Sequence, residues 1–240
     1  MRNLFICFLS GIATSLGFVF CYLKIKKETL ITFTLAFAAS IMFFVSISEL
    51  IPEGIFIINN QYLKPISFLI ITIFLGFGIL IAFSLDKIIK SKEDNLYRIG
   101  VYTAIGLIIH NVLEGVVTYL TLTIDTVIGI KLAISIALHN IPEGISIAIP
   151  LFYSKSGRVK LFKYLIFLSL SEIFGAFLAF LFFQNINFNV IGELYLVIAG
   201  IMMYIAIFEL GKESLNYKKS KIVLSGLALG FILIKILKIL

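Results

Sequence analysis

HNVLEG at residues 110–115 and HNIPEG at residues 139–144 decide the fold of this chain, because each block lies inside a long apolar run. The two blocks share the pattern H-N-x-x-E-G and contain the only two histidines of the sequence. Ionisable side chains are expensive inside a membrane and face the interior of a helix bundle or a water-filled path. The blocks therefore predict two neighbouring membrane helices whose polar faces meet.

The composition extends this prediction to the whole chain of 240 residues, of which 60% are hydrophobic. A soluble domain is nearer 45–50% apolar, and an apolar run of about 20 residues is long enough to cross a bilayer as a helix. We therefore predict an all-α, polytopic membrane protein with residues 1–240 forming a single transmembrane domain. The formal net charge is +7, and most of the basic residues lie in short loops. This placement indicates that they set the orientation of the chain in the membrane rather than bind nucleic acid.

Eight apolar runs give the predicted membrane spans, and the short connections predict antiparallel neighbours. The spans cover about residues 3–23, 29–51, 65–85, 99–122, 126–150, 161–183, 189–211 and 222–240. The loops after spans 1, 3, 5 and 7 carry 15 of the 20 Lys and Arg residues. Because cytoplasmic loops carry this excess, we expect a protein of the cell membrane with both termini outside the cytoplasm.

An internal similarity predicts an inverted repeat. Residues 39–54 (ASIMFFVSISELIPEG) and 199–214 (AGIMMYIAIFELGKES) are identical at seven of 16 positions without gaps. Their spans, the second and the seventh, run in opposite directions, as do the fourth and fifth spans that carry the two H-N-x-x-E-G blocks. This pattern relates spans 1–3 to spans 6–8 and is typical of secondary transporters. Chance similarity between apolar helices is the alternative for the second and seventh spans.

The polar residues of the two blocks fall on shared helix faces. Residues three and four apart lie on one side of an α-helix, so His110 points the same way as Glu114, and His139 the same way as Glu143. Nitrogen and oxygen ligands suit zinc and other divalent cations, and the absence of a thiolate from the blocks disfavours Cu(I). The candidate metal ligands are His110, Asn111, Glu114, His139, Asn140, Glu143 and Glu172.

Glu172 joins this set because it lies in the middle of the sixth span. An acidic residue at a helix centre costs about 3 kcal/mol on insertion scales, and a divalent cation would neutralise several such groups together. Whether one ion or two bind stays open. Interhelical hydrogen bonds are the alternative role for the two histidines, and a hydrogen bond to a serine is the alternative for Glu172.

Glutamates at helix ends form a second acidic set: Glu49 and Glu53 end the second span, and Glu209 and Glu213 end the seventh. Solvated helix-end charges are the favoured interpretation, and symmetry-related vestibules that attract cations are the alternative.

Three further features of the spans concern packing. We expect the two methionines at equivalent repeat positions, Met42 and Met202, to fill space in the core. Gly115 and Gly144 predict a close approach of the fourth and fifth spans to each other, and Pro142 predicts a break in the fifth span.

At these residues the chain resembles the ZIP (Zrt/Irt-like) family of divalent metal transporters. The resemblance rests on the two blocks, on SLSExxGA at residues 169–176 and on GIMxYIAxxEL at residues 200–210, and it covers essentially the whole chain. It implies zinc uptake into the cytoplasm, with Fe²⁺, Mn²⁺ and Cd²⁺ as further cargoes, by movement of spans 1, 4, 5 and 6 against the rest.

The resemblance also implies a binuclear site. One metal would use His110, Glu114, His139 and Glu143, and the second would use Asn111, Asn140 and Glu172 together with the shared glutamates of the blocks. The chain departs from many relatives at Leu113, where they carry proline. It also departs in its loop over residues 86–98, which has no histidine, so we predict no metal sensing there.

We therefore expect a zinc-transporting membrane protein rather than an enzyme, with divalent metal ions and the lipid bilayer as partners and a homodimer permitted. An intramembrane metal-dependent hydrolase is one alternative, since it would need the same ligands plus a general base. A carrier of an organic solute driven by protons or sodium is another. A passive metal channel remains open within the main hypothesis.

Overall fold

The computed structural model describes residues 2–88, 95–155, 158–182 and 189–237, and these residues are almost entirely helical. The basic residues Lys90, Lys92 and Lys238 of the topology argument, and residues 89–94 of the loop over residues 86–98, lie outside them. The elements, in chain order, are α1 (Arg2–Ile12), η1 (Ala13–Tyr22), α2 (Lys27–Val45), η2 (Ser46–Leu50), α3 (Ile51–Asn59), α4 (Lys64–Ile88), α5 (Asn95–Ile124), α6 (Thr126–Tyr153), α7 (Arg158–Phe182), α8 (Asn189–Tyr204), η3 (Ile205–Gly211), α9 (Lys212–Asn216) and α10 (Ser220–Leu237).

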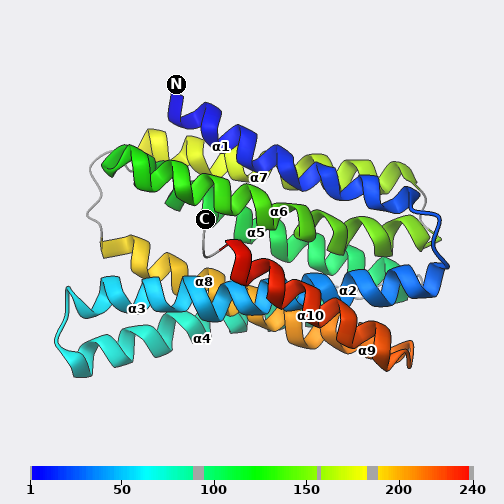
Figure 1. Ribbon diagram of the computed structural model, residues 1–240. Helices are drawn as coiled ribbons and strands as arrows, with labels where there is room; N and C mark the ends of the chain where they lie inside the picture. Colours follow the sequence, from blue (N-terminus) through cyan, green and yellow to red (C-terminus); the bar gives the residue numbers. More distant parts are fainter. Residues whose placement is uncertain (1, 89–94, 156–157, 183–188, 238–240) are drawn as a thin grey trace.

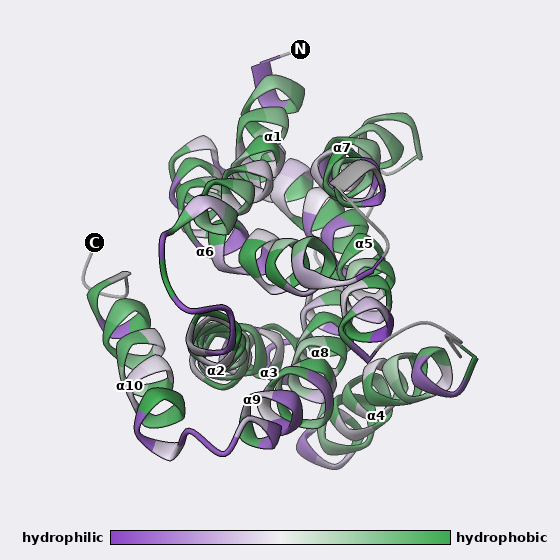
Figure 2. Cartoon of the chain, turned by 90° about the vertical axis from the view of Figure 1, so that its right-hand side faces the viewer, coloured by the Kyte–Doolittle hydropathy of each residue, from purple (hydrophilic) through white to green (hydrophobic). Residues whose placement is uncertain are grey.

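The helices confirm a polytopic membrane protein. Within the described ranges, seven continuous helical segments are long and apolar enough to cross a bilayer. They correspond to the first seven predicted spans, and α10 occupies the place of the eighth. Hydrophobic residues predominate along most helices (Figure 2), and many large hydrophobic side chains, among them Phe68, Leu69 and Leu224, are exposed, as expected of a surface that contacts lipid.

The helices form two groups that lie side by side (Figures 1 and 2). The first group, called here the site bundle, contains α1–η1, α5, α6 and α7, with α5 packed on α7 and α6 packed on η1. The second group, called here the support bundle, contains α2–α3, α4, α8–α9 and α10, with α2 packed on α10 and α4 on α8. Contacts of α2 with α6 and of α5 with α8 join the two bundles.

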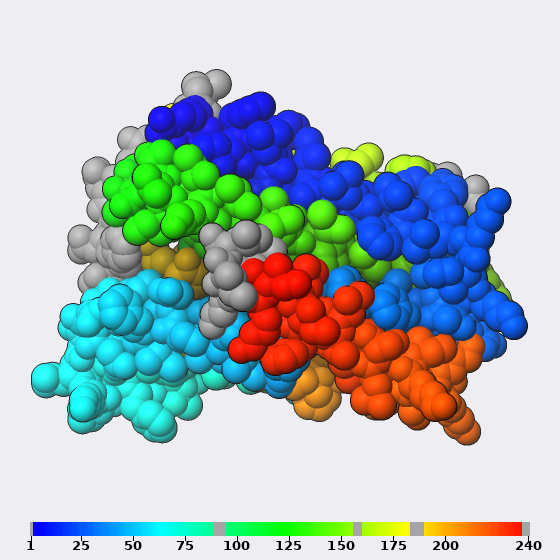
Figure 3. All heavy atoms as spheres, viewed as in Figure 1, coloured from blue at the N-terminus to red at the C-terminus, as the bar shows by residue number. Residues whose placement is uncertain are grey.

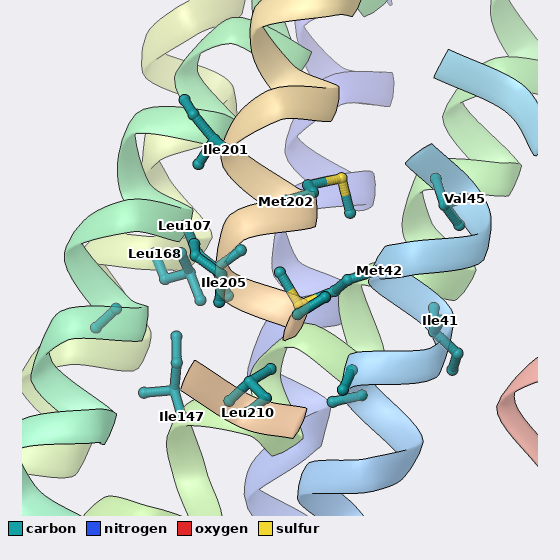
Figure 4. Packing of buried hydrophobic residues seen from close by; sticks show 14 of the residues in the cluster. Ile41, Met42, Val45, Leu107, Ile147, Leu168, Ile201, Met202, Ile205 and Leu210 are labelled. Carbon is teal, nitrogen blue, oxygen red and sulfur yellow. The ribbon is translucent and has the colours of Figure 1, made fainter. Parts of the chain in front are cut away.

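The inverted repeat is visible in the packing. The segments α2–η2–α3 and α8–η3–α9 run in opposite directions (Figure 1). Each contains a wider, π-helical turn at the matching place, η2 in the first and η3 in the second. Met42 and Met202, the matching methionines, are buried between α2 and α8 (Figure 4). The prediction that they pack in the core is therefore confirmed.

The π-helical turns explain why the second span is longer than the sequence predicted. The helix that was expected to end near residue 51 continues through Pro52 to Asn59. Proline lacks the amide proton of a helical hydrogen bond, and at this point the N–H of Ile51 already bonds to the carbonyl of Ser46, five residues earlier. The widened turn lets the helix pass the proline without ending.

Gly115 and Gly144 were predicted to bring the fourth and fifth spans close together, and this prediction is wrong: each glycine approaches a different helix. A Cβ atom on Gly115 would collide with the backbone carbonyl of Glu172 on α7, and one on Gly144 with the backbone carbonyl of Thr14 on η1. The glycines therefore bring α5 against α7 and α6 against η1, rather than α5 against α6. Where the two blocks meet, the facing sides of α5 and α6 carry Glu114 and His139 instead, whose side chains contact each other between the helices.

Candidate metal centre

The two blocks meet because α6 begins directly after α5 ends. Asp125 separates the helices, and its Oδ1 accepts hydrogen bonds from the backbone N–H groups of Val127 and Ile128 at 2.8 and 3.0 Å. This cap satisfies donors at the start of α6 and returns the chain antiparallel to α5. Helix α6 then continues through Pro142 to Tyr153, so the prediction that Pro142 interrupts the fifth span is wrong.

Two cross-helix pairs form the centre of the site. Nε2 of His139 on α6 lies 3.1 Å from Oε1 of Glu114 on α5, and Nε2 of His110 on α5 lies 3.2 Å from Oε1 of Glu143 on α6. Within α5, Nε2 of His110 is also 3.3 Å from Oε1 of Glu114. The structure thus brings together the four residues that the resemblance to the ZIP family implied as the ligands of one metal ion.

These four side chains are buried, with exposed fractions between 0 and 4%. Several of their polar atoms have no hydrogen-bond partner among the described residues: Nδ1 and Nε2 of His110, Oε2 of Glu114, Nδ1 of His139 and both carboxylate oxygens of Glu143. Unsatisfied buried polar atoms are costly, so a cluster of them in one place is the chemistry expected of a site that receives a cation.

Glu172, the third carboxylate, lies beside Asn140. Nδ2 of Asn140 donates to Oε2 of Glu172 at 2.9 Å and to the backbone carbonyl of Ser10 at 3.1 Å. This geometry leaves Oδ1 of Asn140 and Oε1 of Glu172 without partners within the described part of the chain. Asn111 is fully buried, and neither its side-chain oxygen nor its nitrogen has a partner there.

As the side chains stand, imidazoles and carboxylates pair with one another. The described residues contain no group of three or more His, Cys, Asp and Glu side chains placed to hold a metal ion. Because each Nε2 atom contacts a carboxylate oxygen directly, an entering ion would have to replace these pairs rather than fill a ready-made cage.

A cavity with a volume of about 710 Å³ leads to the site from the end of the molecule where α5 turns into α6. We call this the α5–α6 end, and the other the α4–α5 end. The cavity opens between the two bundles, with α6 along one wall and η2–α3 along the other, and Figure 3 shows the seam between α6 and α3. Glu114 and His139 lie in its wall together with Glu49, Glu53 and Lys131.

At the α4–α5 end, polar contacts join the same two bundles beside a smaller pocket of about 220 Å³. Arg98 on α5 lies 2.9 Å from Asp86 on α4 and 3.1 Å from Glu209 on η3. Nδ2 of Asn95 on α5 donates to Oε2 of Glu213 on α9 at 2.8 Å. The sequence analysis placed Asp86 and Arg98 in a loop, whereas Asp86 belongs to α4 and Arg98 to α5. Their ion pair could not be predicted, because the residues between them do not determine which sides of the two helices face each other.

These contacts correct the interpretation of the second glutamate pair. Glu209 and Glu213 were expected to be solvated, but their exposed fractions are 4% and 7%. Sequence reasoning also missed Lys131 as a cavity residue and the Ser10 carbonyl as a partner of Asn140. The Lys131 signal was available, since a lysine two turns before the HNIPEG block lies inside a predicted span.

Comparisons with known proteins place the chain in a family. The model of the ZIP zinc transporter family matches residues 90–238. The zinc transporter ZupT of Streptococcus mutans is 31% identical over 246 residues, which cover 95% of this chain and 93% of the relative. ZupT of Oceanobacillus iheyensis is 33% identical over 261 residues, covering 95% and 97%. ZupT of Chlorobium limicola is 31% identical over 242 residues, covering 92% and 91%. The chain belongs to the ZIP zinc transporter family.

Proposed function

We propose that this protein carries divalent metal ions, zinc first among them, across the cell membrane through the site formed by α5, α6 and α7. The observation that carries the proposal is the pair of buried cross-helix contacts, Glu114–His139 and His110–Glu143, at the inner end of a 710 Å³ cavity. The relatives named above are zinc transporters, which supports transport and speaks against the hydrolase alternative.

Three N–O distances among the four side chains support a tetrahedral ion. Zinc binds histidine nitrogen and carboxylate oxygen at about 2.0–2.2 Å, so two ligands of a tetrahedron are about 3.3–3.6 Å apart. The N–O distances of 3.1–3.3 Å between these side chains are close to that separation. Small outward shifts would therefore admit an ion, which would replace the direct pairs by metal–ligand bonds.

Asn111, Asn140 and Glu172 would supply a second position beside the first. The free atoms Oδ1 of Asn140 and Oε1 of Glu172 are the groups that this position would use. Oxygen ligands of this kind suit Mn²⁺ and Fe²⁺ as well as Zn²⁺, so we propose that the second position contributes to the range of cargoes, which includes Cd²⁺.

The proposed orientation places the α5–α6 end outside the cell. The loops after spans 1, 3, 5 and 7 carry most of the Lys and Arg residues, and basic loops stay in the cytoplasm. The cavity that reaches Glu114 and His139 would then admit ions from outside, and transport into the cytoplasm would require the α4–α5 end to open.

Uptake by purified protein in liposomes tests the proposal. Zn²⁺, Fe²⁺, Mn²⁺ and Cd²⁺ are offered separately to wild type and to a His139→Ala, Glu143→Ala variant, with a trapped indicator as the readout. Glu28→Gln is the matched control, because Glu28 is an exposed glutamate paired with Lys219 at 2.9 Å, far from the site in sequence. Saturable uptake that is retained in the control and lost in the double variant is expected. Equal flux through wild type and the folded double variant would contradict it.

A further inference from the structure

The inverted repeat places a pair of glutamates at each end of the boundary between the two bundles. A shift of 160 residues converts Glu49 into Glu209 and Glu53 into Glu213. The first pair belongs to η2–α3 and the second to η3–α9, which are the matching segments of the support bundle. If the repeat carries function, the two pairs should do the same task at opposite ends.

At the α4–α5 end this task is visible. Arg98 from the site bundle reaches Glu209 at 3.1 Å, and Asn95 reaches Glu213 at 2.8 Å. Both glutamates are buried there. At this end, a cation of one bundle therefore pairs with the repeat glutamate of the other.

At the α5–α6 end the matching groups stand apart. Glu49, Glu53 and Lys131 all line the 710 Å³ cavity, with the glutamates on the support bundle and Lys131 on α6 of the site bundle. Lys131 and Glu53 are exposed to the cavity, and over the described ranges none of the three groups has an ion-pair partner. A lysine facing two carboxylates across a cavity that must admit cations would hinder entry unless it had another use.

We infer that Lys131 is a gating residue, which pairs with Glu49 or Glu53 when the cavity closes and thereby replaces the Arg98–Glu209 contact that breaks at the opposite end. The inference rests on the proposed transport function, since it explains how one transport site would open to one end at a time. Each end would then close by the same kind of contact: a cation of the site bundle against a repeat glutamate of the support bundle.

The exchange of contacts gives the two cations opposite effects. Removing Lys131 weakens only the state in which the cavity is closed, so the open population should rise. Removing Arg98 weakens only the state shown here, so the open population should fall. A partly exposed ion pair contributes up to about 1 kcal/mol, which corresponds to a shift of about fivefold for Lys131. The buried Glu209 should make the Arg98 effect at least as large.

The experiment measures cavity opening directly. Ser135 lines the cavity on α6, and Ser135→Cys provides a thiol whose rate of labelling by a bulky maleimide, in metal-free nanodiscs, reports the open population. The native Cys7 and Cys21 are buried, and the unsubstituted protein supplies the background. Lys131→Gln should raise the rate, Arg98→Gln should lower it, and the double variant should return toward the parent.

Lys64→Gln is the matched control, because Lys64 begins α4 at the same end but does not line the cavity. Arg98→Lys keeps the charge and guards against a folding defect in Arg98→Gln. The inference is overturned if the Arg98→Gln and double variants label at the same rate, or if Lys64→Gln and Lys131→Gln behave alike. Because the labelling needs no metal and no flux, this failure is separate from a failure of the uptake assay.

Discussion

The blocks HNVLEG of α5 and HNIPEG of α6 have nearly the same sequence but different surroundings. Among the described residues that line the cavity, each block contributes one member: Glu114 from α5 and His139 from α6. These two form what we call the front pair, 3.1 Å apart. His110 and Glu143 form the back pair, 3.2 Å apart and fully buried behind it.

The difference teaches that the working unit is not the motif on one helix but a pair across two helices. The repeat converts His110 into His139 and Glu114 into Glu143, and so converts the back pair into the front pair. Two equivalent pairs therefore lie one behind the other along the two helices, and among the described residues that line the 710 Å³ cavity the front pair is present and the back pair is not.

The largest expected effect is the loss of zinc uptake when either pair is removed. Zinc binding, rather than uptake, should then distinguish the front pair from the back pair. Removing the front pair (Glu114→Ala, His139→Ala) or the back pair (His110→Ala, Glu143→Ala) should each lower zinc uptake on the order of 100-fold or more, because even residues that only support ligands cost 10–100-fold when replaced. Calorimetric titration in nanodiscs should still detect weak zinc binding after loss of the back pair, and none after loss of the front pair.

Binding of similar strength in both variants would remove the distinction between front and back. The Glu28→Gln control should titrate as wild type, since its carboxylate is at the surface. If a double variant does not elute as folded protein, its two single substitutions are titrated separately instead.

The next effect concerns how the two blocks are packed. Gly115→Ala and Gly144→Ala would each drive a Cβ into a backbone carbonyl, on Glu172 and Thr14 respectively, and a backbone cannot move aside as a side chain can. Overpacking of this kind typically costs about 1–3 kcal/mol. Thermal unfolding in detergent should show a clear fall in the midpoint for both.

Gly76→Ala is the control for this pair, because a Cβ there meets nothing within 4 Å. If Gly144→Ala were as stable as the control while Gly115→Ala was not, the two blocks would differ in packing as well as in exposure.

A smaller effect is expected from the residues that face the two glycines. Glu172 on α7 packs beside Gly115, and Thr14 on η1 occupies the matching place beside Gly144. Glu172→Gln keeps a partner for Asn140 but removes a carboxylate, so uptake should fall about tenfold. Thr14→Val should stay close to wild type in uptake, since the Thr14 hydroxyl has no hydrogen-bond partner in the described part of the chain. Equal losses would show that the α6–η1 side also holds an ion.

Much of this arrangement could be predicted from sequence, because its signals are local. Helical spacing placed Glu114 four residues after His110 and Glu143 four after His139, and both pairs do share a face. The apolar runs located seven continuous spans to within a few residues at most ends. The similarity of residues 39–54 to residues 199–214 predicted that the two segments occupy equivalent places. It did not predict that each contains a π-helical turn.

The rest depends on which faces meet in space. Nothing in the sequence says that Gly115 approaches α7 rather than α6, or that Arg98 lies between Asp86 and Glu209. Such contacts join residues more than 10 positions apart, and their choice is made by the packing of all helices together. The burial of Glu209 and Glu213 was missed for this reason.

The smallest expected effect is a change in which of the two pairs is accessible from outside the bundle. Because the chain has two histidines, His110→Gln and His139→Gln each leave one imidazole, whose modification by diethyl pyrocarbonate can be followed by absorbance. His139 lines the cavity and should react a few-fold faster than the fully buried His110. If Arg98→Gln opens the opposite end, the order should reverse, since the back pair would then face the open side. Unchanged rates in that background would mean that the two pairs hold fixed roles, one for entry and one for retention, despite the symmetry of their sequences.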